Sequence, residues 1–493
     1  MPPLTIRPFV DFLLLLGLGS LIIYKSSKPP QLTETSWPND DSVEDRVTAT
    51  QNSVAFPRTF FTSILHTKSP AGFWMFSKLY LHKGTIYAVA PTWAEKESYP
   101  DLKFILAQPK KMGPESSGDK AKPTEKEMVV LTADEAKSLI GALENAELLG
   151  GLSIILYDVN QFMAHYYHWW GELMLGTVKS YSAAISSPPR HRVVPLEPSQ
   201  FITPHVANQS WRDRAGVNKP LMQAAFPGAS VEDKGYWDKL QNTNQTFVFE
   251  QAMIVSRIAA HKHPLARSWG KMIGSTMNTT VPLGFWEPLR RRVVQNMAKR
   301  GTNQITSLIT PRGRASKKED SLLKSSVLSH TRKPLVLYIS RQATPHRRLR
   351  TEDDEDLIRA LEALDIEGVC EFQAVKMEKL NFQDQIKLIA RSTVLIGLHG
   401  NGLTHQIWMP SSPQSTIIEI FYPKMYLHDY EMLALNVGHK HYAVWNDTFV
   451  TYPEGETFPG TRTGPELHSV TIPVQGQTVA QIVRERLATP AQS

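Results

Sequence analysis

The sequence IGLHGNGLTH, residues Ile396–His405, joins a short apolar run to a segment that favours a helix. The run, TVLIG, predicts a buried strand, and a helix is expected to begin near Gly402. Gly400 and Gly402 let backbone N–H groups approach a ligand closely, and a helix N-terminus there would offer unpaired donors to a diphosphate. The alternative is a tight strand-to-helix turn without a ligand. The polar side chains at this turn are His399, Asn401 and Thr404.

Strands and helices alternate on both sides of this stretch. The expected strands are Pro334–Ser340, Val369–Val375, Thr393–Gly397, Ser415–Phe421 and His441–Trp445. The other expected helices are Glu352–Leu364, capped by Thr351, then Glu378–Arg391 and a short one around Tyr430–Leu435. Strands separated by helices imply crossover connections and a parallel sheet. Such sheets bind ligands beyond the carboxyl ends of their strands.

Two kinds of charged residue lie at that edge of the expected sheet. Four arginines follow the first strand, namely Arg341, Arg347, Arg348 and Arg350. Guanidinium groups match phosphate oxygens, and Arg341 is expected on the ligand side, whereas Arg348 and Arg350 are expected to pair with the acids at 352–356. Glu419 lies inside a buried strand, where a charge is costly unless it is paired or functional. It could accept a ribose hydroxyl or pair with an arginine.

In the first half of the chain, strands and helices alternate less regularly. Its expected strands are Gly84–Ala90, Phe104–Gln108 and Leu152–Asp158, and its expected helices are Asp134–Glu147, His165–Ala184 and Trp286–Arg300. On the second helix His165, His168 and Glu172 share one face. Glu172 could orient His168 as a general base for a hydroxyl. Alternatives are a metal site, for which no second ligand cluster is evident, and plain aromatic packing. Asp213 is a further candidate acid.

The charge of the chain is concentrated in one segment. Residues 287–333 hold 12 Lys or Arg against 3 Asp or Glu, a surplus of 9, whereas the whole chain carries +7. The segment lacks the aromatic residues that nucleic-acid binding favours, so we expect no nucleic-acid partner. Residues 301–330 also lack periodicity and are expected to form a flexible basic linker. It would separate an α/β domain at 59–300 from a second one at 331–493.

The N-terminus indicates a membrane-anchored protein. Residues 12–24 are apolar and short for a spanning helix, which fits a signal-anchor within residues 1–25 or a signal peptide. Residues 26–58 have the composition of a stem linker. Glycosylation sequons occur at Asn208, Asn244, Asn278 and Asn446. The single cysteine, Cys370, leaves no intramolecular disulfide.

Four blocks of sequence carry a family resemblance. They are NQFMAHYYHWWGELMLG, WRDRAGVN, YISRQATPHRRL and VLIGLHGNGLTHQIWMPSSPQSTIIEIFYP, in that order. The chain resembles glycosyltransferase family 61, and its fungal members in particular, with Asn401 where many members carry alanine. The resemblance implies an inverting enzyme of GT-B type, with two Rossmann-like domains and parallel sheets facing a cleft. It also implies a UDP-sugar donor carrying xylose, N-acetylglucosamine or a similar sugar. A metal is not strictly required, although a divalent cation could take part.

The resemblance further implies a type II protein of the ER or Golgi membrane that modifies a glycan or glycoprotein in the lumen. The residues expected at the donor site are Arg341, Arg347, His399, Gly400, Asn401, Gly402, Thr404 and Glu419. The base is expected from the first half, with His168, Glu172 and Asp213 as candidates. Two other functions stay open, a catalytically inactive nucleotide-sugar-binding protein and a metal-dependent hydrolase that uses His165, His168 and Glu172.

Overall fold

The computed structural model describes residues 60–141, 143–186, 193–306, 333–453 and 455–490. The expected anchor at 1–25 and stem at 26–58 lie outside these residues, as does the part of the expected linker from 307 to 330. Within the described ranges, no helix is both long and apolar enough to span a bilayer. The anchor therefore stays a prediction.

The described part of the first half is built on one eight-stranded sheet. Its strands are β1 Ser63–Ile64, β2 Phe73–His82, β3 Thr85–Ala90, β4 Met128–Thr132, β5 Glu147–Leu156, β6 Gln200–Ile202, β7 Ser230–Glu232 and β8 Thr246–Val255. The order is β4-β3-β2-β8-β5-β6-β7, with β1 on β2. The sheet is mixed, because β2 runs antiparallel to both β3 and β8. The expectation of a purely parallel sheet was wrong here: Lys83 and Gly84, both at positive φ, form a two-residue hairpin turn.

Helices cover this sheet and connect its strands. They are α2 Trp93–Glu97, α3 Ala133–Ile140, α4 Leu175–Ile185, α5 Asn218–Ala225, α6 Lys234–Gln241, α7 Arg257–Ala260, α8 Pro264–Trp269 and α9 Glu287–Thr306. A π-helix, η4 Tyr167–Met174, runs directly into α4. The short 3₁₀ turns are η1 Leu102–Phe104, η2 Pro114–Ser116, η3 Leu143–Asn145 and η5 Met272–Thr276.

Three expectations for this half were wrong. The segment expected as a strand at 104–108 follows the 3₁₀ turn η1 and joins no sheet strand in the described residues. The helix expected over 134–147 ends at Ile140, because Gly141 adopts φ 81° and breaks it. The expected linker begins too early, since α9 continues through Thr306.

The described part of the second half is built on a six-stranded sheet of order β10-β9-β11-β12-β13-β14. Its strands are β9 Leu335–Ile339, β10 Glu371–Val375, β11 Ser392–Leu398, β12 Thr416–Ile420, β13 Lys440–Trp445 and β14 Thr448–Val450. The first five strands of that order are parallel, as expected, and β14 is antiparallel. The connecting helices are α11 Thr351–Ile366, η6 Met377–Lys379, α12 Phe382–Arg391, η7 Asn401–Trp408, α13 Asp429–Val437, η8 Pro465–His468 and α14 Gly476–Ala488. The cap of α11 is Arg350 rather than Thr351.

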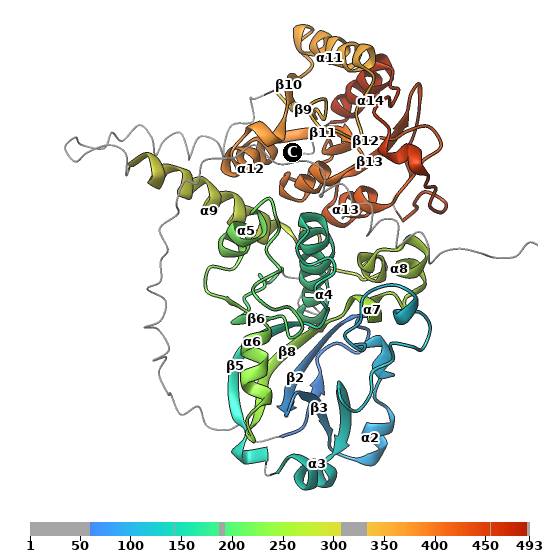
Figure 1. The fold of residues 1–493 in the computed structure, drawn as a ribbon. Coiled ribbons are helices and arrows are strands. Elements are labelled where there is room, and N and C mark those ends of the chain that lie inside the picture. The colour runs from blue at the N-terminus through green and yellow to red at the C-terminus, as the bar shows by residue number, and fades with distance from the viewer. Residues whose placement is uncertain (1–59, 142, 187–192, 307–332, 454, 491–493) are drawn as a thin grey trace, which may run out of the picture.

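The two halves share one apolar core. A single cluster of buried side chains runs from Phe73 and Trp170 in the first half to Leu395 and Leu433 in the second. Figure 1 shows the second sheet above the first, with α4 and α13 between them. The contact is close at Gly171 of η4, where an added Cβ would lie 2.9 Å from the Leu433 side chain. The two halves are therefore in extensive contact.

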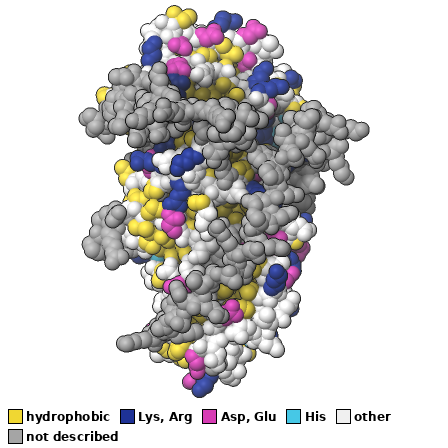
Figure 2. All heavy atoms as spheres, turned by 90° about the vertical axis from the view of Figure 1, so that its left-hand side faces the viewer, with side chains coloured by type: hydrophobic (Ala, Val, Ile, Leu, Met, Phe, Trp, Pro, Cys, Tyr) yellow, Lys and Arg dark blue, Asp and Glu magenta, His cyan; other side chains and the backbone are white. Residues whose placement is uncertain are grey.

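Basic residues on the face that carries α9 are locally balanced. Figure 2 shows Lys and Arg side chains scattered among hydrophobic and acidic ones on this side. Arg290 and Arg291 pair with Glu287, and Arg292 pairs with Glu197. The positive charge that the sequence places on this helix is thus partly neutralised by neighbouring carboxylates.

Candidate active site

The turn after β11 brings two arginines to the glycine-rich stretch. Gly400 has φ 152° and ψ 173°, a conformation nearly confined to glycine, and caps the 3₁₀ helix η7. An ideal Cβ on Gly400 would lie 3.1 Å from Arg341 Nη1 and 3.3 Å from Arg347 Nη1. Arg347 Nη1 also donates to the His399 carbonyl at 3.3 Å. The backbone can therefore approach both guanidinium groups only because the side chain is missing.

These two guanidinium groups form no ion pair with a carboxylate of the described residues. Burial lowers the pKa of Arg341, and the charge of Arg347 lowers it further. Two partly buried like charges without an acid between them favour a bound anion, and paired guanidinium groups suit phosphate oxygens.

His399 is held by a buried carboxyl group. Its Nδ1 lies 2.5 Å from Glu419 Oε1, and His441 Nε2 lies 2.8 Å from Glu419 Oε2. Burial lowers the pKa of His399 well below its usual value and raises that of Glu419 well above its own, because it disfavours charge on both groups. Both oxygens of Glu419 face histidines, so its position favours orienting His399 over contacting a ribose.

The remaining residues of the turn interact with one another. Thr404 is buried, and its Oγ1 donates to Asn401 Oδ1 at 3.2 Å. Gly402 is within the first turn of η7, where an added Cβ would lie 3.4 Å from Ile339. The turn is thus a closely packed end of β11 with an exposed Asn401.

The π-helix η4 presents a histidine–carboxylate pair. His168 Nδ1 lies 2.5 Å from Glu172 Oε2, and the side chain of His168 keeps 19% of its surface exposed. Burial lowers the pKa of His168, although the charge of Glu172 opposes this shift. A neutral His168 that donates from Nδ1 to Glu172 keeps the lone pair of Nε2 for a proton, which is the state a general base requires.

Glu172 is fully buried and bonded on both oxygens. Arg257 Nη1 donates to Oε2 at 2.5 Å, and the Met272 backbone N–H donates to Oε1 at 2.9 Å. Burial works against its charge, but Arg257, His168 and Lys271 together hold the pKa of Glu172 well below the usual value. The carboxylate is therefore ionised and fixed in position.

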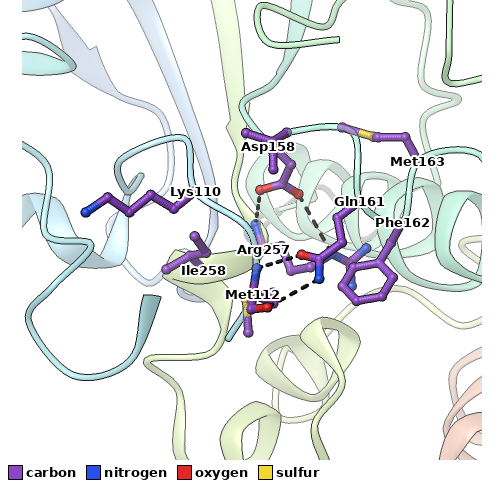
Figure 3. A pocket seen from close by; sticks show the side chains of 9 residues that line it. Lys110, Met112, Asp158, Gln161, Phe162, Met163, Arg257 and Ile258 are labelled. Carbon is purple, nitrogen blue, oxygen red and sulfur yellow. Dashed lines mark hydrogen bonds and ion pairs between the residues drawn. The ribbon is translucent and has the colours of Figure 1, made fainter. Parts of the chain in front are cut away.

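Asp158 and Phe162 contact Arg257 and hold it in position (Figure 3). Its backbone N–H donates to Asp158 Oδ1 at 2.8 Å, and its Nε lies 4.0 Å from Asp158 Oδ2. Its guanidinium group lies 5.0 Å from the centre of the Phe162 ring, and that ring is 4.6 Å from the ring of His168. Asp158, Arg257 and Phe162 thus enclose the histidine–carboxylate pair on one side.

A buried ion pair links the two groups of residues. Lys271 Nζ, from the first half, lies 2.9 Å from Asp429 Oδ1 at the start of α13. The charges of Lys271 and Asp429 act on the pKa of His399, and Lys271 also acts on that of His168. Ring contacts connect the two histidines: the Tyr167 ring lies 5.2 Å from His168 and 5.6 Å from Tyr430, and the Tyr430 ring lies 5.3 Å from His399. His168 and His399 therefore belong to one polar site between the halves.

Other residues singled out from the sequence lie differently. Asp213 Oδ1 accepts the backbone N–H of Asn218 at 2.7 Å, at the start of α5. No contact joins Asp213 to His168 among the described residues, so its catalytic role stays a prediction. His165 is exposed, with its ring 4.9 Å from that of His168.

The metal-site alternative finds no support in this geometry. Within the described ranges, no three metal-binding side chains converge. Both oxygens of Glu172 are occupied, and the neighbouring Arg257 charge would repel a cation. The sequence reasoning missed Arg257, Lys271, Asp429 and His441, none of which lies in a recognisable local motif.

Comparisons with known proteins identify one family. The family model described as Glycosyltransferase 61 matches residues 166–418, slightly more than half of the chain. A Drosophila melanogaster protein, EGF domain-specific O-linked N-acetylglucosamine transferase, is 34% identical over 121 residues, which are 24% of this chain and 21% of that protein. The aligned stretch thus spans about a fifth of the relative. The solved E. coli ADP-heptose lps heptosyltransferase II aligns over 69% of this chain and 98% of its own, at 10% identity and a TM-score of 0.26.

Proposed function

The chain belongs to the glycosyltransferase 61 family and is a glycosyltransferase, and we propose that it transfers a sugar from a UDP-sugar with inversion. The acceptor is a hydroxyl of a glycan or glycoprotein, and the reaction takes place in the ER or Golgi lumen, with the body anchored through residues 1–25. We assign the two halves to the GT-B type. The relative's name includes N-acetylglucosamine, so UDP-N-acetylglucosamine is the first donor to test, followed by UDP-xylose.

The donor diphosphate binds at Gly400, in contact with Arg341 and Arg347. This diphosphate is part of the leaving group, UDP, and gains negative charge as the bond between the anomeric carbon and the UDP oxygen breaks. Fixed cationic and N–H donors stabilise such charge, and these arginines have no carboxylate partner in the described residues to compete for them. His399 lies beside them and is held through Nδ1 by Glu419. A neutral Glu419 that donates its hydrogen to Nδ1 leaves the ring hydrogen on Nε2, which can then donate to the diphosphate.

The acceptor is activated from the first half. Nε2 of His168 takes the proton of the acceptor hydroxyl, while Glu172 holds Nδ1 and stabilises the imidazolium that forms. The oxygen then attacks the anomeric carbon on the face opposite UDP, so the C–O bond to UDP breaks as the new one forms. UDP leaves with the bonding electrons.

One observation carries this proposal: Arg347, which donates to the His399 carbonyl, and the His168–Glu172 pair come from different halves, yet the rings of Tyr430 and Tyr167 connect His399 to His168. A donor held by one half and a base held by the other is the arrangement that displacement at a sugar carbon requires.

The test is a screen of UDP-sugars by thermal shift, followed by UDP release from the sugar that raises the melting temperature most. We expect one donor to raise the melting temperature most, and Arg341→Gln to reduce that shift strongly. Arg359→Gln, which removes an exposed arginine of α11, is the matched control and should bind normally. Equal binding of UDP by all three proteins would refute the donor site.

A further inference from the structure

A second polar pocket lies outside the site described above. It has a volume of about 550 Å³, within the range of ligand-binding pockets. It is lined by the segment before β2, the start of β2, η1, the α7–α8 junction and the residues after η5. The side chains that matter for the argument are His66, Lys68, Trp74, Phe104, Lys262 and His263.

The lining is basic. Two lysines and two histidines contribute to it, and no Asp or Glu is among the described residues that line it. Burial lowers the pKa of His66, and the charge of Lys68 lowers it further. Asp101 pairs with Lys103, and Asp119 pairs with Lys122 while its charge also acts on Lys262. Lys262 Nζ donates one hydrogen bond to the Gly118 carbonyl and keeps two further N–H donors.

Donors and apolar walls complete the lining. The Leu265 backbone N–H donates to His263 Nδ1 at 3.3 Å, which leaves the hydrogen of the neutral ring on Nε2. Phe104 and Trp74 supply aromatic surface. Trp74 Nε1 and Ser275 Oγ are buried without a hydrogen-bond partner in the described residues, a condition that a polar ligand or water commonly relieves.

The 3₁₀ helix η5 contacts both the pocket and the carboxylate that orients the proposed base. In η5, Met272 donates its backbone N–H to Glu172, whereas Ser275 lines the pocket. Three residues of 3₁₀ helix span roughly 6 Å. Glu172 and the pocket thus lie at the two ends of one short, buried 3₁₀ helix.

We propose that the pocket bounded by Lys68 and Lys262 binds an anionic saccharide unit of the acceptor, one that carries a phosphate, sulfate or carboxylate. This inference deepens the proposed transfer and rests on it for the acceptor's identity as a glycan. Lysine cations and the His263 Nε2 hydrogen bind the anionic group, and the aromatic side chains contact the sugar ring.

The experiment is calorimetric titration with glucose 6-phosphate and with glucose at pH 7. Three proteins are compared, namely the wild type, Lys68→Gln/Lys262→Gln, and Lys137→Gln/Lys239→Gln. The last pair removes the same charge from exposed positions on α3 and α6. Expression in bacteria keeps the sequon at Asn278, on the pocket lining, free of glycan. Any binding at the donor arginines is common to all three proteins and cancels from the comparison.

We expect glucose 6-phosphate to bind the pocket variant at least tenfold more weakly than the wild type or the control variant, and glucose to bind none of them measurably. Equal affinity in all three proteins, no binding to the wild type, or equally tight binding of glucose would overturn the proposal. Calorimetry needs neither donor nor turnover, so such a failure leaves the proposed transfer intact. Conversely, loss of UDP-sugar turnover alone would refute the transferase mechanism without altering this binding result.

Discussion

Replacing Glu172 by Gln tests the proposed base most directly. The wild-type carboxylate accepts hydrogen bonds from His168 Nδ1, Arg257 Nη1 and the Met272 backbone N–H. A neutral amide has one accepting and one donating end, so it cannot satisfy all three donors. Either His168 loses the partner that keeps its hydrogen on Nδ1, or the backbone N–H is left unbonded.

The expected loss of activity is large. General-base catalysis contributes a factor of about 10² to 10⁴, so we expect kcat for UDP release to fall at least about 100-fold in Glu172→Gln. Affinity for UDP should stay near wild type, because the arginines belong to the other half. The charge of Glu172 raises the pKa of His168, so the residual activity should extend to lower pH than in the wild type.

Stability gives a second, independent readout. Removing one partner of a buried ion pair lowers the free energy of unfolding by about 3–5 kcal/mol, and we expect a loss of this size in Glu172→Gln. The Arg257 guanidinium group would then face the Asp158 carboxylate at an N–O distance of 4.0 Å. Glu172→Gln/Arg257→Met should regain much of that stability while staying inactive. Glu287→Gln, in a partly exposed pair, is the matched control and should change neither property strongly. A stable Glu172→Gln variant with normal kcat would refute the assignment of His168 as base.

Three further results are expected. Arg341→Gln should weaken UDP binding about 10- to 100-fold in calorimetry, because a charged hydrogen bond contributes about 1.5–3 kcal/mol; unchanged affinity would place the diphosphate elsewhere. Gly400→Ala should cost about 1–3 kcal/mol in urea unfolding, since its φ of 152° is strained for other residues, whereas Gly402→Ala should cost less. Burial lowers the pKa of His405 and of His439 to about 4. Between pH 6.5 and 4 the unfolded chain therefore binds more protons than the folded one, and the free energy of unfolding decreases as the pH is lowered. The loss is on the order of 2 kcal/mol per histidine at pH 5, and equal melting temperatures at pH 7 and pH 5 would contradict it.

Local patterns predicted much of the second half. Short apolar runs separated by helical segments gave the order of strands in the chain and their parallel direction, because crossover helices leave a clear spacing. The pairing of His168 with Glu172 could be predicted because residues four apart are neighbours on a helix. The π-helical winding of that segment could not be predicted from a local pattern, and its Gly171 packs against Leu433 from the other half.

The partners of Glu419 show where local reasoning ends. In the sheet, Glu419 lies beside Ala443, and His441 lies two residues earlier on the same neighbouring strand. Which residues meet across strands depends on the register of the strands, and this register cannot be deduced from local patterns in one sequence. The Lys271–Asp429 pair is harder still, because its members belong to different halves of the chain.

The apolar cluster common to both sheets has a consequence for how the protein could be divided. Expressed alone, each half would expose a large hydrophobic surface to water, and such surfaces drive aggregation or association. Two polypeptides produced together from a gene interrupted between codons 307 and 332 should recognise each other through that surface and reassemble. Recovery of both pieces as one soluble complex would turn this transferase into a split reporter.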